Sequence, residues 1–181
     1  MGFALAPRLN ASGRMDTAEI GVKLLCASSM SEALDYAHTL NDLNDSRRAE
    51  EAEIVTSALA MLATKDLNSM RAIVLKSEDW NPGIIGIAAS KLCDIYYKPT
   101  ILFAQQGDVL TGSVRSIPEI NIFEVLSKHS DMYLHFGGHK KAAGLTLPAD
   151  KYAEFSYAIN HQLKTSFAPN TFIPKKFYDF R

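Results

Sequence analysis

Residues 71–76 read RAIVLK, a short apolar run with β-branched residues between two charged ends. Such a run is typical of a strand buried inside a sheet. Pro82 and Gly83 follow it, and apolar residues then recur at helical spacing as far as Tyr96. Because proline is favoured in the first turn of a helix, we predict a helix here that Pro99 ends.

Further elements extend this strand and helix into a sheet. A second apolar run at 100–104 precedes the turn Gly107-Asp108, so residues 109–115 are expected to form its hairpin partner. We also predict a short helix at 122–128, a strand at 143–147 and a last amphipathic helix at 149–165. The fold class is therefore α/β, with a mixed β-sheet flanked by helices.

A long helix is predicted before this sheet. Ser31 followed by Glu32 is a favourable helix start, and apolar residues keep a helical period to about residue 64. The highly charged middle of this segment, 44–53, suits a helix that crosses solvent between two bodies. A shorter helix is predicted at 17–27, whereas residues 1–16 are expected to be loop-like.

The composition excludes several classes of protein. The chain has 181 residues, 47% of them hydrophobic, and a net charge of −1, so it is expected to fold and is not a generally basic nucleic-acid binder. No apolar run approaches the roughly 20 residues that cross a bilayer, and no signal peptide is evident. Cys26 and Cys93 lie in apolar helical contexts and are expected to be buried free thiols, so we expect a cytoplasmic location.

Residues 136–144, FGGHKKAAG, combine features of a phosphate-binding loop. Gly137 and Gly138 can expose backbone N–H groups, His139 can donate a hydrogen bond, and Lys140 adds positive charge. The alternative is an ordinary tight turn whose lysines point into water. A zinc site using His135 and His139 is disfavoured, because the Gly-Gly pair between them is a poor helix interior.

Two other polar groups suit an anion. In the extended segment 112–116, Ser113 and Arg115 point to the same face, and Arg offers a planar fork of donors to phosphate. The alternative is an exposed edge strand with Arg115 paired to a carboxylate.

Near the start of the chain, the segment 8–14 places Arg8, Asn10 and Arg14 around a glycine turn. Such a group would suit a polyanion, unless it is only a disordered chain end. No nucleophile–base pair and no metal-ligand spacing stands out elsewhere. The sequence therefore offers anion-binding groups without a complete hydrolytic centre.

The three segments, in this order, resemble the RecJ family of single-strand-specific exonucleases within the DHH phosphoesterase superfamily. They are RLNASGR at 8–14, GSVRSIP at 112–118 and FGGHKKAAG at 136–144. The segment 80–90, WNPGIIGIAAS, also matches, although many relatives carry His where this chain has Asn81.

The resemblance implies a domain layout. Residues 1–16 would be a polar inter-domain segment, 17–68 a helical connector, 69–165 the DHH-associated domain, and 166–181 a tail leading to a further domain. The catalytic DHH domain, which binds Mn²⁺ or Mg²⁺ in such enzymes, would lie outside this chain, and no metal ligands are expected within it.

The resemblance also implies a function, a 5′-to-3′ exonuclease of DNA repair and recombination that acts on single-stranded DNA. The expected phosphate-binding residues are Arg8, Asn10, Arg14, Ser113, Arg115, Ser116, Gly137, Gly138, His139 and Lys140, with His139 also catalytic. Expected partners are single-stranded DNA, the absent DHH domain, and a single-strand-binding protein or a helicase. Two alternatives stay open: a DHH-type phosphodiesterase of short oligonucleotides or cyclic dinucleotides, and a docking module that uses the apolar helix at 82–97.

Overall fold

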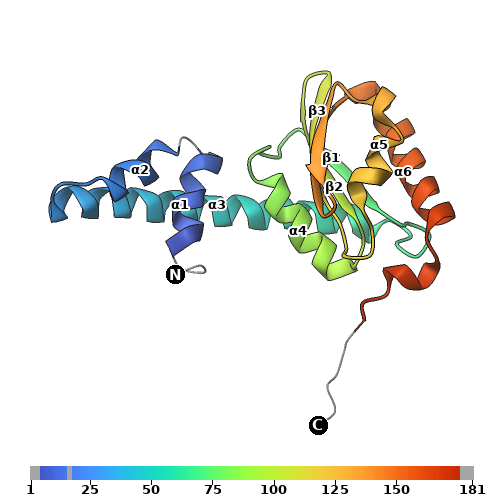
Figure 1. Cartoon of the computed structure of the whole chain (residues 1–181), viewed down its shortest axis with the longest axis horizontal. Coiled ribbons are helices and arrows are strands. Elements are labelled where there is room, and N and C mark those ends of the chain that lie inside the picture. Colours follow the sequence, from blue (N-terminus) through green and yellow to red (C-terminus); the bar gives the residue numbers. More distant parts are fainter. Residues whose placement is uncertain (1–4, 16–17, 176–181) are drawn as a thin grey trace, which may run out of the picture. The chain divides into compact units, whose positions relative to one another are not determined.

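The computed structural model describes residues 5–15 and 18–175. The chain divides into two compact units, Met1–Ile54 and Val55–Arg181, and the boundary falls inside one long helix (Figure 1). This helix, α3 (Met30–Ala63), is 34 residues long, so the predicted continuous helix is confirmed.

The first unit begins with a helix where we expected a loop. Helix α1 (Leu5–Met15) is followed by α2 (Glu19–Leu25) and then by α3. The loop prediction for residues 1–16 is wrong for the described residues, because Pro7 lies in the first turn, where its missing N–H costs little. Arg8 Nε donates a hydrogen bond to Asn41 Oδ1 of α3 at 2.6 Å, which ties the two helices together.

The second unit is built on a five-stranded sheet of order β1-β2-β3-β5-β4. Strands β1 and β2 are parallel, and the other neighbouring pairs are antiparallel. The strands are β1 (Ile73–Ser77), β2 (Thr100–Gln106), β3 (Val109–Arg115), β4 (His135–His139) and β5 (Ala142–Pro148). The helices are α4 (Ile85–Tyr96), α5 (Ile122–Ser127) and α6 (Tyr152–Ser166), with 3₁₀ turns at Ser130–Met132, Ala149–Lys151 and Pro169–Phe172. The predicted α/β class with a mixed sheet is confirmed.

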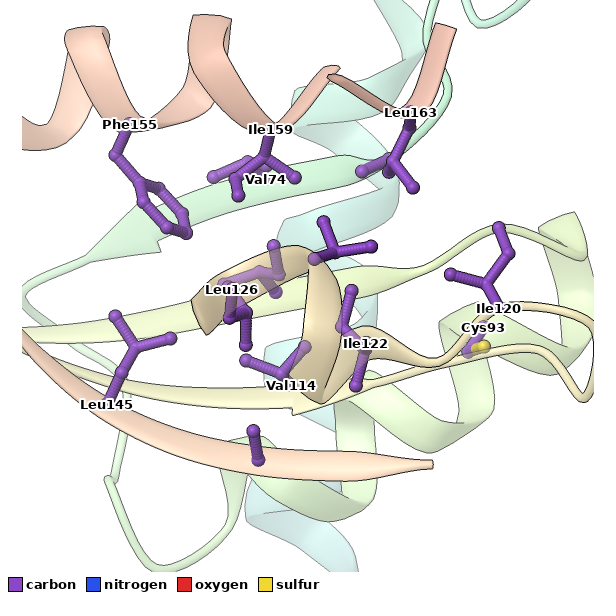
Figure 2. Close-up of a cluster of buried hydrophobic side chains, with 14 of the residues drawn as sticks. Val74, Cys93, Val114, Ile120, Ile122, Leu126, Leu145, Phe155, Ile159 and Leu163 are labelled. Carbon is purple, nitrogen blue, oxygen red and sulfur yellow. The ribbon is translucent and has the colours of Figure 1, made fainter. Parts of the chain in front are cut away.

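Helices cover the two faces of this sheet differently. Helix α4 lies against β2 and β3 on one face, which we call the α4 face, and α5 and α6 lie on the other, the α6 face (Figure 1). Figure 2 shows side chains of α6, such as Phe155 and Ile159, directed at Val114 and Leu145 of the sheet. The main core therefore lies between the sheet and α6.

One glycine is required by this core. Gly112 of β3 pairs with Phe103 of β2, and the Phe103 ring fills the space above it. A Cβ added to Gly112 would lie 2.5 Å from Phe103 Cε1. A ring that covers a glycine in this way buries apolar surface that the glycine itself cannot supply.

Three expectations about particular residues need correction. The glycine-rich stretch is not a loop, because residues 135–139 and 142–148 pair as β4 and β5 around a short turn. The expected extended tail at 166–181 instead forms the turn Pro169–Phe172, whose Phe172 is buried in the core, while residues 176–181 lie outside the described part. Cys93 is buried as expected, but Cys26 is exposed.

Among the described residues, no helix combines the length and the apolar character needed to cross a membrane.

Candidate phosphate-binding site

Three strands bring the predicted site residues of the second unit onto the α4 face. Arg115 of β3 is paired with Ala142 of β5, which is paired with His139 of β4. Because directly paired residues share a face, Arg115 and His139 stand in one row, two strand spacings or about 10 Å apart at the backbone. Ser113, Gly144 and Gly137 form the next row of the same face. The predicted common face of Ser113 and Arg115 is therefore present.

The side chains of Ser113 and Arg115 converge on the first turn of α4. A Cβ added to Gly86 would lie 2.8 Å from Arg115 Nη2 and 3.3 Å from Ser113 Oγ. Arg115 also donates through Nε to Ser90 Oγ at 3.0 Å and through Nη1 to the Val114 carbonyl at 2.7 Å. A hydroxyl and a guanidinium thus meet at the amino end of a helix, whose dipole also favours an anion.

Asn81 shapes the start of this helix. Its carbonyl oxygen accepts hydrogen bonds from the N–H groups of Ile84 and Ile85, at 3.0 and 3.1 Å, and its Oδ1 accepts one from the Gly83 N–H at 2.9 Å. Asn81 therefore has a structural role at the entry to α4. This is the position where many RecJ relatives carry His.

Cys93 of the same helix lies within the electrostatic reach of Arg115. Burial raises the pKa of the Cys93 thiol to about 12, the charge of Asp94 adds to this rise, and Arg115 opposes it. Cys93 therefore stays a neutral thiol near pH 7 and does not offset the charge of Arg115.

Beyond α4, one row of the same face carries no side chains where β5 and β4 pair, and it lies between the rows of His139 and His135. Gly144 and Gly137 face each other and both are exposed. A Cβ at Gly137 would meet no described atom within 4 Å, and one at Gly144 only the Gly112 carbonyl oxygen at 3.9 Å. Neither glycine is needed for internal packing, which leaves a flat strip of backbone that a large ligand can approach closely.

Gly138, which follows Gly137 in β4 and pairs with Ala143, is required by the packing of the two strands. A Cβ there would lie 2.5 Å from the Ala142 carbonyl oxygen and 2.5 Å from Ala143 Cα. Gly138 therefore permits the close approach of β4 to β5.

His139 closes β4 with a defined orientation. The Lys141 N–H donates a hydrogen bond to His139 Nδ1 at 3.3 Å, so the ring proton of neutral His139 resides on Nε2. The His139 side chain is exposed, and this Nε2–H is the donor that it can present to a ligand.

Lys140 and Ser116 help to hold the β4–β5 turn. The carbonyls of Lys140 and Lys141 accept hydrogen bonds from the N–H groups of Ile122 and Ser116, both at 3.0 Å. The Ser116 hydroxyl donates to the Ile120 carbonyl at 3.1 Å, so it stabilises the adjoining loop. The Lys140 side chain is exposed at the turn.

The predicted residues of the first unit do not all share one pocket. Asn10 and Arg14 line a pocket of about 390 Å³ with Leu9, Gly13 and Ala18. Arg8 instead lines a pocket of about 230 Å³ with Pro7, Asn44, Arg47 and Arg48. The structure therefore groups Asn10 with Arg14 and places Arg8 beside two other arginines.

Sequence reasoning did not single out Gly86 and Ser90 as parts of the site, nor Arg47 and Arg48 as neighbours of Arg8. Gly86 and Ser90 stand four residues apart on α4, which puts them on one face of the helix. That spacing was visible in the sequence, but which strand this face would meet was not.

The described residues contain no group of three or more His, Cys, Asp or Glu side chains that could hold a metal ion.

This sheet, with its glycine-rich final hairpin, defines a known class of domain. The DHHA1 domain family matches residues 69–165, and the chain belongs to that family.

The curated proteins similar to this chain include single-stranded-DNA-specific exonucleases. The chain is 38% identical over 176 residues to the single-stranded-DNA-specific exonuclease RecJ of Bacillus subtilis, covering 96% of this chain and 22% of that protein. The RecJ of Haemophilus influenzae is 39% identical over 170 residues, covering 88% of this chain and 29% of that protein. The chain thus spans about a quarter of the length of these curated relatives.

A solved structure agrees with these relatives. The crystal structure of RecJ from Thermus thermophilus in complex with Mg²⁺ matches 92% of this chain and 26% of that chain, with a TM-score of 0.83 and 31% identity. A structure of the same protein in complex with Mn²⁺ matches with a TM-score of 0.82. The resemblance to the RecJ family is confirmed.

Proposed function

We propose that this chain is the strand-holding part of a RecJ-type exonuclease that removes nucleotides from the 5′ end of single-stranded DNA. One observation carries the proposal: Ser113 Oγ and Arg115 Nη2 both lie against Gly86 in the first turn of α4. The relatives named above, which are single-stranded-DNA-specific exonucleases, make DNA the ligand class to test.

The 5′-terminal phosphate is the proposed ligand of Ser113 and Arg115. A phosphate monoester carries between about −1.5 and −2 charges at pH 7, more than an internal phosphodiester. A guanidinium, a hydroxyl and a helix amino end together favour the more highly charged group. The site therefore selects a phosphorylated end over a hydroxyl end.

The glycine strip is proposed to hold the strand next to that end. Gly137 and Gly144 let a phosphate reach the backbone, and His139 Nε2–H donates a hydrogen bond to it from the end of β4. Lys140 adds charge beside this contact. Such backbone contacts carry no sequence information, so binding is expected to be independent of base sequence and sensitive to salt.

Arg8, Asn10 and Arg14 are proposed as further phosphate contacts in the first unit. Asn10 and Arg14 act together, since they share one pocket. Arg8 acts beside Arg47 and Arg48 in the other pocket.

Hydrolysis itself is assigned to a part of the enzyme outside this chain. The RecJ structures that resemble it contain Mg²⁺ or Mn²⁺, and a metal ion would stabilise charge at the scissile phosphate there. The 181-residue chain alone is expected to bind DNA weakly and to cleave none. We place the complete enzyme in DNA repair and recombination in the cytoplasm, where a single-strand-binding protein or a helicase would present the strand.

Binding to two oligonucleotides that differ only at the 5′ end tests the proposal. We expect the chain to bind 5′-phosphorylated oligothymidylate more tightly than the 5′-hydroxyl form. Fluorescence anisotropy of oligonucleotides labelled at the 3′ end measures the two affinities. Arg115→Ala is expected to reduce that preference by about 1.5–3 kcal/mol, the size of a charge-assisted hydrogen bond.

Lys151→Ala is the matched control, since it also removes one positive charge but from an exposed ion pair with Glu154 at the start of α6. It should leave the preference for the phosphorylated end unchanged. Equal affinity of the wild-type chain for both ends would overturn the proposed function. Tight binding of dinucleotides with no preference for longer strands would favour the short-oligonucleotide phosphodiesterase instead.

A further inference from the structure

We propose that Ser90 is a positioning residue that fixes the Arg115 guanidinium for recognition of the 5′-terminal phosphate. This inference rests on the proposed function and adds to it the residue that prepares the site. Ser90 lies on α4, one turn after Gly86, and faces β3 across the α4 face of the sheet.

The hydrogen bonds of Ser90 define its direction. Its hydroxyl donates to the Gly86 carbonyl at 3.1 Å, four residues earlier in the helix. Because a hydroxyl has one proton, its oxygen then accepts from Arg115 Nε, at 3.0 Å. Ser90 therefore connects the first turn of α4 directly to the guanidinium.

This connection orients the rest of the arginine. With Nε held by Ser90 and Nη1 held by the Val114 carbonyl at 2.7 Å, the plane of the guanidinium is fixed by two bonds in different directions. Nη2 then lies over Gly86, where an added Cβ would be only 2.8 Å away. Gly86 leaves the space that Nη2 occupies, and Ser90 holds Nε by a hydrogen bond.

The expected benefit is preorganisation. An arginine side chain loses substantial rotamer entropy when it is held in one geometry, and a group already fixed before binding avoids much of that cost. Without the Ser90 hydroxyl, Nε loses this acceptor and the guanidinium can leave the orientation that faces the phosphate. Recognition of the phosphorylated end should weaken while binding to the rest of the strand should not.

The test compares Ser90→Ala with a matched serine elsewhere. Ser127 of α5 makes the same kind of bond, donating to the Phe123 carbonyl four residues earlier at 2.7 Å, but it lies on the α6 face, across the sheet from Arg115. Ser90→Ala should lower the preference of the chain for 5′-phosphorylated over 5′-hydroxyl oligothymidylate by about three- to tenfold, the value of one hydrogen bond. Ser127→Ala should leave it unchanged.

A double mutant separates positioning from general damage. If Ser90 acts through Arg115, Ser90→Ala should have no further effect on the preference in an Arg115→Ala background. As a second measurement, NMR exchange of the Arg115 Nε–H with water should accelerate in Ser90→Ala and stay slow in Ser127→Ala.

The outcomes are distinguishable from those for the proposed function. A wild-type chain without preference for the phosphorylated end, or an Arg115→Ala variant that retains it, overturns the proposed function and this inference with it. A preference that needs Arg115 but is unchanged in Ser90→Ala overturns the inference alone. Equal losses from Ser90→Ala with and without Arg115, or unchanged Nε–H exchange, also overturn it.

Discussion

The two faces of one sheet use glycine for opposite purposes. On the α6 face, Gly112 leaves room for the Phe103 ring, which stands between β2 and α6 and contacts Phe155 edge to face with ring centroids 5.5 Å apart. On the α4 face, Gly137 and Gly144 leave room that no side chain of the described chain fills. The contrast separates a glycine that internal packing requires, Gly112, from two glycines that it does not require, Gly137 and Gly144.

The largest effect is expected where a glycine is filled. Gly112→Ala places a methyl group 2.5 Å from Phe103 Cε1 and 3.3 Å from Leu145 Cγ, so the ring has to move. We expect a loss of about 1–3 kcal/mol in the free energy of unfolding, the usual cost of overpacking. Urea denaturation followed by far-UV circular dichroism measures it.

Gly144→Ala is the control on the opposite face. Its methyl group would meet no described atom closer than 3.9 Å, so the stability should stay within about 0.5 kcal/mol of the wild type. Equal destabilisation by both substitutions would show that the two faces do not differ in the way described.

The elements of the sheet could be predicted because their patterns are local. The apolar run of β1, the Pro82-Gly83 entry to α4 and the turn at Gly107-Asp108 each show in a short window of sequence. The pairing of β4 with β5 could not be predicted in this way. A glycine that exposes backbone in a loop and a glycine that leaves one face of a strand without a side chain look the same in the sequence. Only the pairing of β4 with β5 distinguishes the two cases.

The candidate site was predictable to the same extent. The period of two in β3 gave Ser113 and Arg115 a common face, as the structure has it. The contact of Arg115 with Ser90 depends on how α4 docks on β3, which is a tertiary event that no local pattern encodes. Similarly, the sequence segment 8–14 grouped Arg8 with Arg14 around an expected glycine turn, whereas the helical geometry of α1 directs them into different pockets.

The next largest effect is expected on DNA binding when a glycine of the α4 face is replaced. Gly144→Val places a β-branched side chain on the strip between Ser113 and Gly137, where it should block the approach of a phosphate to the backbone. We expect about a tenfold weaker affinity for oligothymidylate, equal to about 1.4 kcal/mol, with stability little changed. Fluorescence anisotropy and urea denaturation on the same samples measure the two quantities.

A Gly144→Val chain that binds DNA as well as the wild type would show that the strand does not cross this strip. The proposed path of the DNA would then have to avoid β5 and β4.

A smaller effect is expected in the salt dependence. If Arg115 neutralises one phosphate, Arg115→Ala should lower the slope of log affinity against log salt by about 0.7, the value for one contact with a single strand. Between about 50 and 200 mM salt, that difference amounts to about two- to threefold in affinity. Titrations over this range measure the slopes, and parallel lines for the two proteins would exclude a direct phosphate contact by Arg115.

The smallest effect is expected on the stability of the α6 face at alkaline pH. Burial raises the pKa of Tyr152 to about 12, and its hydroxyl donates a hydrogen bond to the Val74 carbonyl of β1 at 3.0 Å. In the unfolded chain, the phenol loses its proton near its ordinary pKa of about 10. The stability that the neutral phenol contributes is therefore fully present below about pH 10 and is lost as the pH rises toward about 12.

Tyr152→Phe should make the fall in urea midpoint between about pH 10 and 11.5 shallower than in the wild type. It should not abolish the fall, because burial raises the pKa of Tyr133 in the same direction. Tyr157→Phe is the matched control, since Tyr157 is 73% exposed and should leave the slope unchanged. The same slope for Tyr152→Phe and Tyr157→Phe would show that burial on the α6 face does not keep the Tyr152 phenol protonated in this pH range.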